Sequence, residues 1–137
     1  MRHLPAIFIS LLFAAACTQV TAPDWSTLPG ADSYVLEYGH GVPRQKKLSL
    51  RESEKAQLRD YMRELAEEGS STPISYAPQY VLSGEDFSLN FDQDVVVLNL
   101  RSSDGAPGGQ FARPRSQADT AVLDLLRRRT STRSLPR

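Results

Sequence analysis

The chain has 137 residues, 40% of them hydrophobic, which suffices for one domain with a core that needs no metal or disulfide. Its sixteen basic and sixteen acidic residues give zero net charge, which excludes the strongly basic surface typical of nucleic-acid-binding proteins. The charge is unevenly divided, because residues 17–112 carry eight basic and fourteen acidic side chains, whereas residues 113–137 carry seven arginines and two aspartates. An acidic body is therefore followed by a basic C-terminal segment.

The first sixteen residues have the composition of a secretory signal peptide. Arg2 precedes an apolar stretch over residues 4–13, and three alanines follow before Cys17. The apolar stretch is shorter than the about 18 residues that a membrane-spanning helix needs. We therefore expect residues 1–16 to be removed on export.

The segment around Cys17 resembles the lipobox of bacterial lipoproteins, with alanines at 14–16 and no leucine at position 14. The resemblance covers only the signal region, and it implies that the Cys17 thiol receives a diacylglycerol and becomes the mature N-terminus. By the sorting rule of this family in enteric bacteria, Thr18 implies the outer membrane, facing the periplasm. The alternative is an ordinary signal cut before Cys17 or after Ala22, and Pro23 argues against the later cut.

Residues 17–31 contain two prolines and show little periodicity, which predicts a lipidated tether. Trp25 is the only aromatic residue in this segment. We expect it to dock onto its own domain or to rest at the membrane interface, rather than to anchor a partner.

Two strands are predicted at residues 32–38 and 45–48, joined as a hairpin by a turn at residues 39–43 that contains glycine and proline. His40 lies in this turn and is the only histidine after the signal. We interpret it as an exposed loop residue, because no second histidine or cysteine accompanies it to complete a metal site. The sequence therefore predicts no metal or other cofactor.

The clearest helical pattern covers residues 49–69. Ser49 with Glu52 predicts the N-terminal cap and Gly69 the C-terminal cap. Four apolar residues recur at the spacing of one buried helix face. They are Leu58, Tyr61, Met62 and Leu65.

Three consecutive strands are predicted at residues 79–83, 87–91 and 95–100, after a connector at residues 70–78. The second has alternating apolar residues and the third is a continuous β-branched and aliphatic run, which is typical of a central strand. Because the turns between them are short, we expect an antiparallel meander.

A long loop is predicted at residues 102–115, because three glycines and two prolines disfavour regular structure. Phe111, Arg113 and Arg115 give this loop an aromatic ring and two cations, which is a plausible contact set for a partner protein. The glycine spacing does not match a phosphate-binding loop.

The last predicted helix covers residues 116–129, followed by a flexible tail at residues 130–137. Ser116 with Asp119 predicts its N-terminal cap, and three arginines complement its negative C-terminal end. The expected buried stripe consists of Ala118, Val122, Leu125 and Leu126.

The element order β-β-α-β-β-β-α predicts an α+β fold. Residues 32–129 are expected to form a single domain, an antiparallel sheet of about five strands with two helices packed on one face.

For function, the sequence favours a lipid-anchored, non-catalytic module of the cell envelope that binds another protein. The alternative is an immunity-type inhibitor, whose acidic strand ends would cap a basic cleft in a toxin. These acidic residues are Glu85, Asp86, Asp92 and Asp94. A hydrolase is the third hypothesis, but without a nucleophile motif or metal cluster it would depend on scattered carboxylates and His40.

Overall fold

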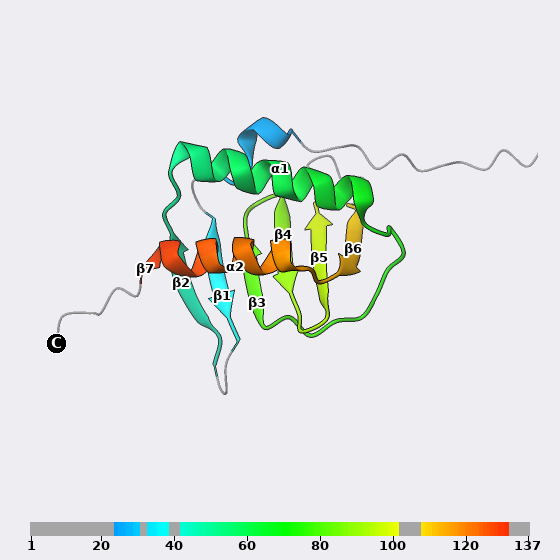
Figure 1. The fold of residues 1–137 in the computed structure, drawn as a ribbon. Coiled ribbons are helices and arrows are strands. Elements are labelled where there is room, and N and C mark those ends of the chain that lie inside the picture. The colour runs from blue at the N-terminus through cyan, green and yellow to red at the C-terminus, as the bar shows by residue number, and fades with distance from the viewer. Residues whose placement is uncertain (1–23, 31–32, 39–41, 102–107, 132–137) are drawn as a thin grey trace, which may run out of the picture.

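The computed structural model describes residues 24–30, 33–38, 42–101 and 108–131. These residues form one antiparallel sheet with two helices, α1 and α2, side by side on the same face (Figure 1). The predicted α+β class and element order are confirmed, with additional short strands. Cys17 and His40 lie outside the described residues.

The order of the strands in the sheet differs from their order along the chain. The sheet order is β6-β5-β4-β3-β1-β2-β7, and every neighbouring pair is antiparallel. The bounds are η1 Trp25–Thr27, β1 Tyr34–Glu37, β2 Arg44–Leu48, α1 Glu52–Glu68, β3 Tyr80–Ser83, β4 Phe87–Phe91, β5 Val95–Leu100, β6 Gln110–Pro114, α2 Gln117–Arg129 and β7 Thr130–Ser131.

The meander β3-β4-β5 is confirmed, and the β1-β2 hairpin joins it through β1. Val35 pairs with Leu82, which pairs with Leu89, which in turn pairs with Leu98. Because paired residues point to the same face, this row is a continuous apolar strip across four strands. The strip lies under the helices and is fully buried.

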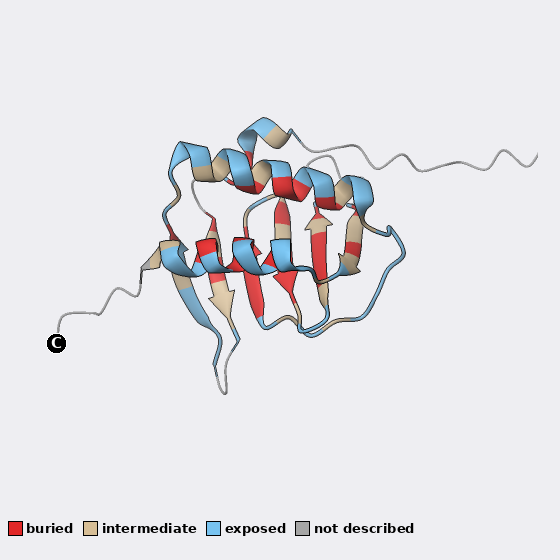
Figure 2. Cartoon of the chain, viewed as in Figure 1, coloured by how far each residue is buried: buried red, intermediate tan, exposed pale blue. Residues whose placement is uncertain are grey.

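The core lies between the sheet and the two helices, as the buried residues in Figure 2 show. The apolar stripe predicted for α1 is buried as expected. In α2 the prediction for Ala118 was wrong, because Ala118 is exposed and Leu123 is buried in addition to the three other predicted residues. The position next to Ala118 is occupied by a buried aspartate, Asp119.

The prediction of a loop over residues 102–115 was wrong at its C-terminal end. Gln110–Pro114 forms β6, which pairs with β5 from Asn99↔Gln110 to Val95↔Pro114. The outer edge of β6 is covered at Ala112, which exchanges two backbone hydrogen bonds with Ser70, at 2.8 and 3.0 Å. Pro114 is tolerated because it stands at the end of an edge strand, where a missing N–H leaves no ladder bond unmade.

The domain also extends beyond both predicted boundaries. Trp25 packs against the core and Leu28 is buried in it, while Arg59 on α1 donates a hydrogen bond to the Leu28 carbonyl at 2.9 Å. Of the two alternatives expected for Trp25, the structure shows docking onto its own domain. At the other end, Thr130–Ser131 pairs with β2, although both residues were assigned to the flexible tail.

Helix α1 begins later than predicted. Arg51, not Ser49, is the N-cap residue, and the Glu54 carboxylate accepts a hydrogen bond from the Arg51 N–H at 2.8 Å. Gly69 is the C-cap, as predicted. Within the part of the chain that the structure describes, no helix is long and apolar enough to cross a membrane.

Candidate functional site

The four acidic residues predicted as a toxin-binding surface lie at opposite ends of β4. Glu85 and Asp86 precede this strand, whereas Asp92 and Asp94 follow it. A five-residue strand separates the two pairs by about 17 Å. The acidic residues therefore do not form one continuous patch.

Asp92 has a role within the fold. Its carboxylate accepts hydrogen bonds from the backbone N–H groups of Ala77, at 3.0 Å, and Gln93, at 2.6 Å. These bonds stabilise the charged form and lower the pKa of Asp92 from its ordinary value. They fix the β4–β5 turn against the connector that precedes β3.

Of the residues predicted as loop contacts, Phe111 and Arg113 point to the helix side of β6. Phe111 pairs with Leu98 and packs against the core. Arg113 donates hydrogen bonds to both oxygens of Asp119, at 3.0 and 2.8 Å, and its guanidinium lies 5.7 Å from the centre of the Tyr61 ring. Arg113 is thus engaged within the domain.

Asp119 is the centre of a buried polar cluster. The sequence predicted Asp119 only as a helix-capping residue. Its carboxylate accepts hydrogen bonds from the Tyr61 hydroxyl at 2.6 Å and the Ser116 N–H at 2.6 Å, in addition to Arg113. Burial raises the pKa of Tyr61, and the hydrogen bond to Asp119 raises it further. The cluster ties α1, β6 and the start of α2 together.

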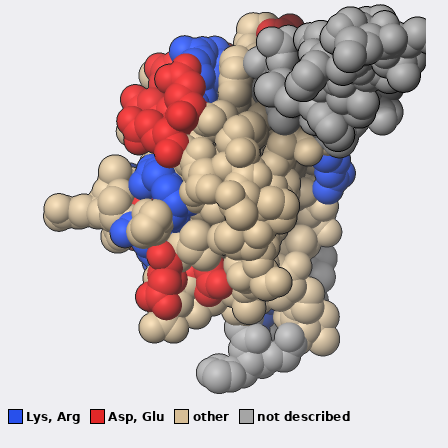
Figure 3. Space-filling model, turned by 90° about the vertical axis from the view of Figure 1, so that its right-hand side faces the viewer, with Lys and Arg blue, Asp and Glu red and all other residues tan. Residues whose placement is uncertain are grey.

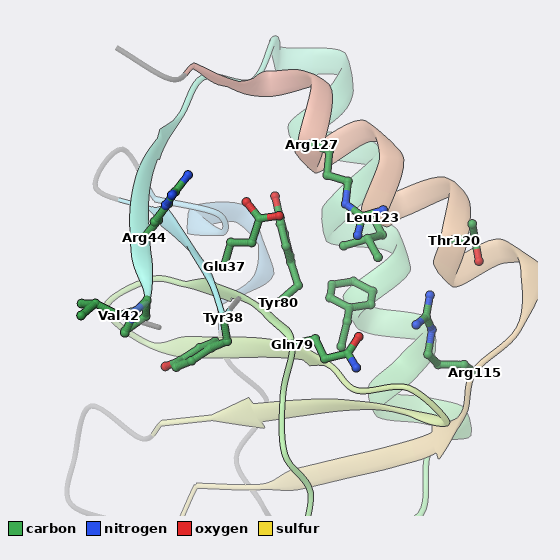
Figure 4. A pocket seen from close by; sticks show the side chains of 12 residues that line it. Glu37, Tyr38, Val42, Arg44, Gln79, Tyr80, Arg115, Thr120, Leu123 and Arg127 are labelled. Carbon is green, nitrogen blue, oxygen red and sulfur yellow. The ribbon is translucent and has the colours of Figure 1, made fainter. Parts of the chain in front are cut away.

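Arg115, unlike the other predicted contact residues, lines the cavity between α2 and the β1-β2 hairpin. The cavity measures about 910 Å³ and lies on the helix side of the sheet, between α2 and the end of the β1-β2 hairpin (Figure 4). We call it the arginine groove. Its lining comprises Glu37, Tyr38, Val42, Pro43, Arg44, Gln79, Tyr80, Phe91, Arg115, Thr120, Leu123 and Arg127.

The floor of the arginine groove is apolar. Tyr80 and Phe91 pair across β3 and β4, with their rings edge to face and their centres 6.4 Å apart. Leu123 of α2 contributes an aliphatic side chain. At the hairpin, Tyr38 and Val42 are 43% and 86% exposed, which makes them available for apolar contact with a ligand.

Three arginines give the groove its charge. Arg44 comes from β2, Arg115 follows β6 and Arg127 points from α2 toward the sheet (Figure 4). Among the described residues, Arg44 and Arg115 form no ion pair; Arg115 instead donates a hydrogen bond to the Asp92 carbonyl at 3.1 Å. The Arg127 guanidinium lies 5.8 Å from the centre of the Tyr80 ring. Its ion-pair partner is Asp124, with 3.8 Å between nitrogen and oxygen, and both side chains are exposed.

Glu37 is the single carboxylate in this lining. Lys46 donates a hydrogen bond to it at 2.6 Å, and this bond is the main reason why the pKa of Glu37 lies below its ordinary value. Because Lys46 neutralises Glu37, the three guanidinium groups remain as an excess of positive charge. Guanidinium groups donate paired hydrogen bonds to carboxylates and phosphates, so the groove is suited to an anionic ligand.

A buried hydroxyl lies beside these charges. Burial raises the pKa of Tyr80 to about 12. The neighbouring Thr130 hydroxyl donates its hydrogen bond to the Arg127 carbonyl at 3.0 Å, and within the described chain the Tyr80 hydroxyl has no hydrogen-bond partner. Tyr80 is therefore neutral near pH 7 and acts in the groove as an aromatic surface.

Sequence reasoning missed Arg44 and Arg127 as site residues. Arg127 was interpreted only as a charge that complements the end of α2, and Arg44 lay at the border of a predicted turn. The signal that could have found Arg127 is the excess of arginines over acidic residues in residues 113–137, whereas no comparable signal in the sequence marks Arg44. Their convergence depends on the docking of α2, which the local sequence does not specify.

The side of the molecule toward β6 differs from the groove. Figure 3 shows this face as largely uncharged, with most charged side chains in view along its left margin, where the helices lie. In the described part of the chain, no group of three or more His, Cys, Asp or Glu residues is placed to hold a metal ion.

Comparison with known proteins gave no relative from which a role could be transferred. No protein-family model, no curated protein and no solved structure matched this chain.

Proposed function

We propose that this protein is a lipid-anchored, non-catalytic binding module of the cell envelope, and that the arginine groove captures a partner protein. The observation that carries the proposal is the cation excess of the groove: three arginines surround a cavity whose single carboxylate, Glu37, is already paired with Lys46. Charge of this kind inside a concave, partly apolar site favours an anionic group on the partner.

The groove is better suited to binding than to catalysis. Arginine keeps its proton at physiological pH, so it stabilises negative charge but does not exchange protons. A general base near neutral pH needs a pKa close to the working pH, and the pKa of Glu37 is lowered away from it.

The anchoring part of the proposal rests on the lipobox resemblance at Cys17 and implies that the domain is held at a membrane, facing the periplasm. An envelope protein is therefore the favoured partner. The toxin-inhibitor alternative requires a continuous acidic surface, and the four acidic residues proposed for it lie in two separate pairs at opposite ends of β4.

The test uses full-length protein isolated from membranes together with bound partners. We expect Arg127→Gln to reduce recovery of the partner, because it removes a groove cation. Arg128→Gln is the matched control: it is the next residue on the same helix, is exposed, makes the same charge change and does not line the groove. Equal partner recovery by both variants would refute the groove as the binding site, and turnover of an envelope substrate by the purified protein would refute the non-catalytic role.

A further inference from the structure

The shape of the arginine groove limits which anionic ligand it can hold. The row Arg44, Glu37, Tyr80 and Phe91 runs across four neighbouring strands, β2, β1, β3 and β4. Neighbouring strands lie about 4.8 Å apart, so the row from β2 to β4 is about 14 Å long. The groove is thus elongated across the strands and lies beneath α2.

Cations stand at both ends of this row. Arg44 lies at the β2 end, and it is exposed. Arg115 lies at the other end, because its guanidinium donates to the carbonyl of Asp92, the residue directly after β4. Between them lie Glu37, which is paired with Lys46, and Tyr80, with the Arg127 guanidinium above the Tyr80 ring.

We infer that the ligand is an extended acidic peptide segment of the partner, with two carboxylates four residues apart and an apolar side chain midway between them. An extended chain advances about 3.4 Å per residue, so positions i and i+4 lie about 14 Å apart and on the same face. Position i+2 shares this face, where an apolar side chain would contact the ring of Tyr80, which lies near the middle of the row. This inference rests on the proposed binding function and specifies the partner's chemistry.

Two features favour a peptide over a small anion. The cavity of about 910 Å³ is near the upper end of the range for sites of drug-sized ligands, about 300–1,000 Å³. Its rim carries the exposed side chains Tyr38 and Val42, which a phosphate or acetate ion would leave uncovered. A segment with apolar and acidic residues covers both the rim and the cations.

The test measures binding of synthetic peptides to the full-length protein in detergent micelles, by fluorescence anisotropy at physiological ionic strength. The probe is acetyl-Asp-Thr-Leu-Thr-Asp-amide carrying a C-terminal fluorophore. The first control, acetyl-Thr-Asp-Leu-Asp-Thr-amide, has the same composition and charge but places the carboxylates two residues apart. The second control replaces both aspartates of the probe with asparagine.

We expect the probe to bind at least about tenfold more tightly than either control, because each control loses at least one charged hydrogen-bonded pair. Arg44→Gln and Arg115→Gln should each weaken probe binding by about tenfold or more. Lys47→Gln is the matched control on β2, since Lys47 is exposed and points away from the groove side. Thermal melts of each variant verify that folding is retained, which matters most for Arg115 with its bond to Asp92.

Equal binding of the probe and the spacing control would overturn the inferred four-residue separation, and equal binding of the asparagine peptide would overturn the acidic ligand. If the probe does not bind at all while partner capture remains sensitive to Arg127→Gln, this inference fails and the proposed function stands. If partner capture is also insensitive to Arg127→Gln, both fail.

Discussion

Arg113 on β6 donates two hydrogen bonds, of 3.0 and 2.8 Å, to Asp119 on α2, and Asp119 is fully buried. Such a pair contributes little net stability when it is intact, because both charges lose their hydration. Replacing only one of the two residues lowers the free energy of unfolding strongly, because the remaining charge stays buried without a partner. The pair therefore fixes how α2 docks on the sheet, and with it the position of the groove residues that α2 supplies.

Asp119→Ala should destabilise the domain by about 3–5 kcal/mol, since it leaves the Arg113 guanidinium without its carboxylate. The exposed pair Asp60–Arg63 is the control, and Asp60→Ala should cost less than about 1 kcal/mol. Urea unfolding measures both values. The Arg113→Ala/Asp119→Ala double variant should lose less than the sum of the single variants, and strict additivity would contradict the coupling.

Tyr61→Phe and Tyr80→Phe remove the same atom with different results. The Tyr61 hydroxyl donates to Asp119, so its loss should cost about 1.5–3 kcal/mol at neutral pH. The Tyr80 hydroxyl is buried and has no hydrogen-bond partner within the described chain, so its loss should leave stability unchanged or raise it. A comparable loss of stability in both variants at pH 7 would contradict this assignment.

The pKa of Tyr80 predicts how the stability of the domain changes at high pH. The pKa of Tyr80 rises from 10.0 to about 12 on folding, so the folded state holds this proton where the unfolded state has released it. Stability should therefore fall as the pH rises above about 10, and Tyr80→Phe should reduce the fall without abolishing it, because the pKa of Tyr61 is also raised. Unfolding curves at pH 8 and at pH 11 measure this difference.

The pKa of Glu54 predicts how the stability of the domain changes at low pH. The Arg51 N–H and the Arg129 guanidinium, whose Nη2 lies 2.6 Å from the Glu54 carboxylate, lower its pKa below the ordinary 4.5. A lowered pKa means that its contribution is present above about pH 4.5 and is lost as the pH falls below that value. Glu54→Gln should therefore destabilise the domain at pH 7 and differ less from wild type at pH 3. A difference that is the same at both pH values would contradict the role of this charge.

The lipid anchor has its own test. We expect the mature protein to begin at an acylated Cys17 and to partition with membranes, because the two acyl chains of a diacylglycerol give stable attachment. Mass spectrometry of the membrane fraction should show a diacylglyceryl adduct at the N-terminus, and Cys17→Ser should release the protein. An unmodified N-terminus, or a Cys17→Ser variant that stays with the membranes, would contradict the anchor.

Local patterns predicted most of the fold, and long-range contacts explain the rest. The alternation in Phe87–Phe91 and the apolar spacing in α1 are properties of neighbouring residues, and both elements formed, although α1 begins later than predicted. Strand β6 was missed because glycines and prolines surround it, and its pairing with β5 outweighs them. Asp119 was expected only as a capping residue, because nothing near it in sequence shows that Tyr61 donates to it.

The site was less predictable than the fold. Of the predicted contact residues, Arg115 lines the groove, whereas Phe111 and Arg113 pack beneath the helices. Arg44 and Arg127 lie 83 positions apart in sequence and meet only because α2 lies across the hairpin end of the sheet. A cation excess formed in this way cannot be recognised from any single segment.

The most direct measurement is photo-crosslinking in intact cells with a photoreactive phenylalanine at position 120. Thr120 is exposed and lines the groove, whereas its neighbour Ala121 is exposed but points about 100° away around the helix. We predict a partner adduct from position 120 and none from position 121, lost with Arg127→Gln and retained with Arg128→Gln. Adducts of equal yield from both positions, or no adduct from position 120, would contradict the claim that this protein acts by binding a partner in the arginine groove.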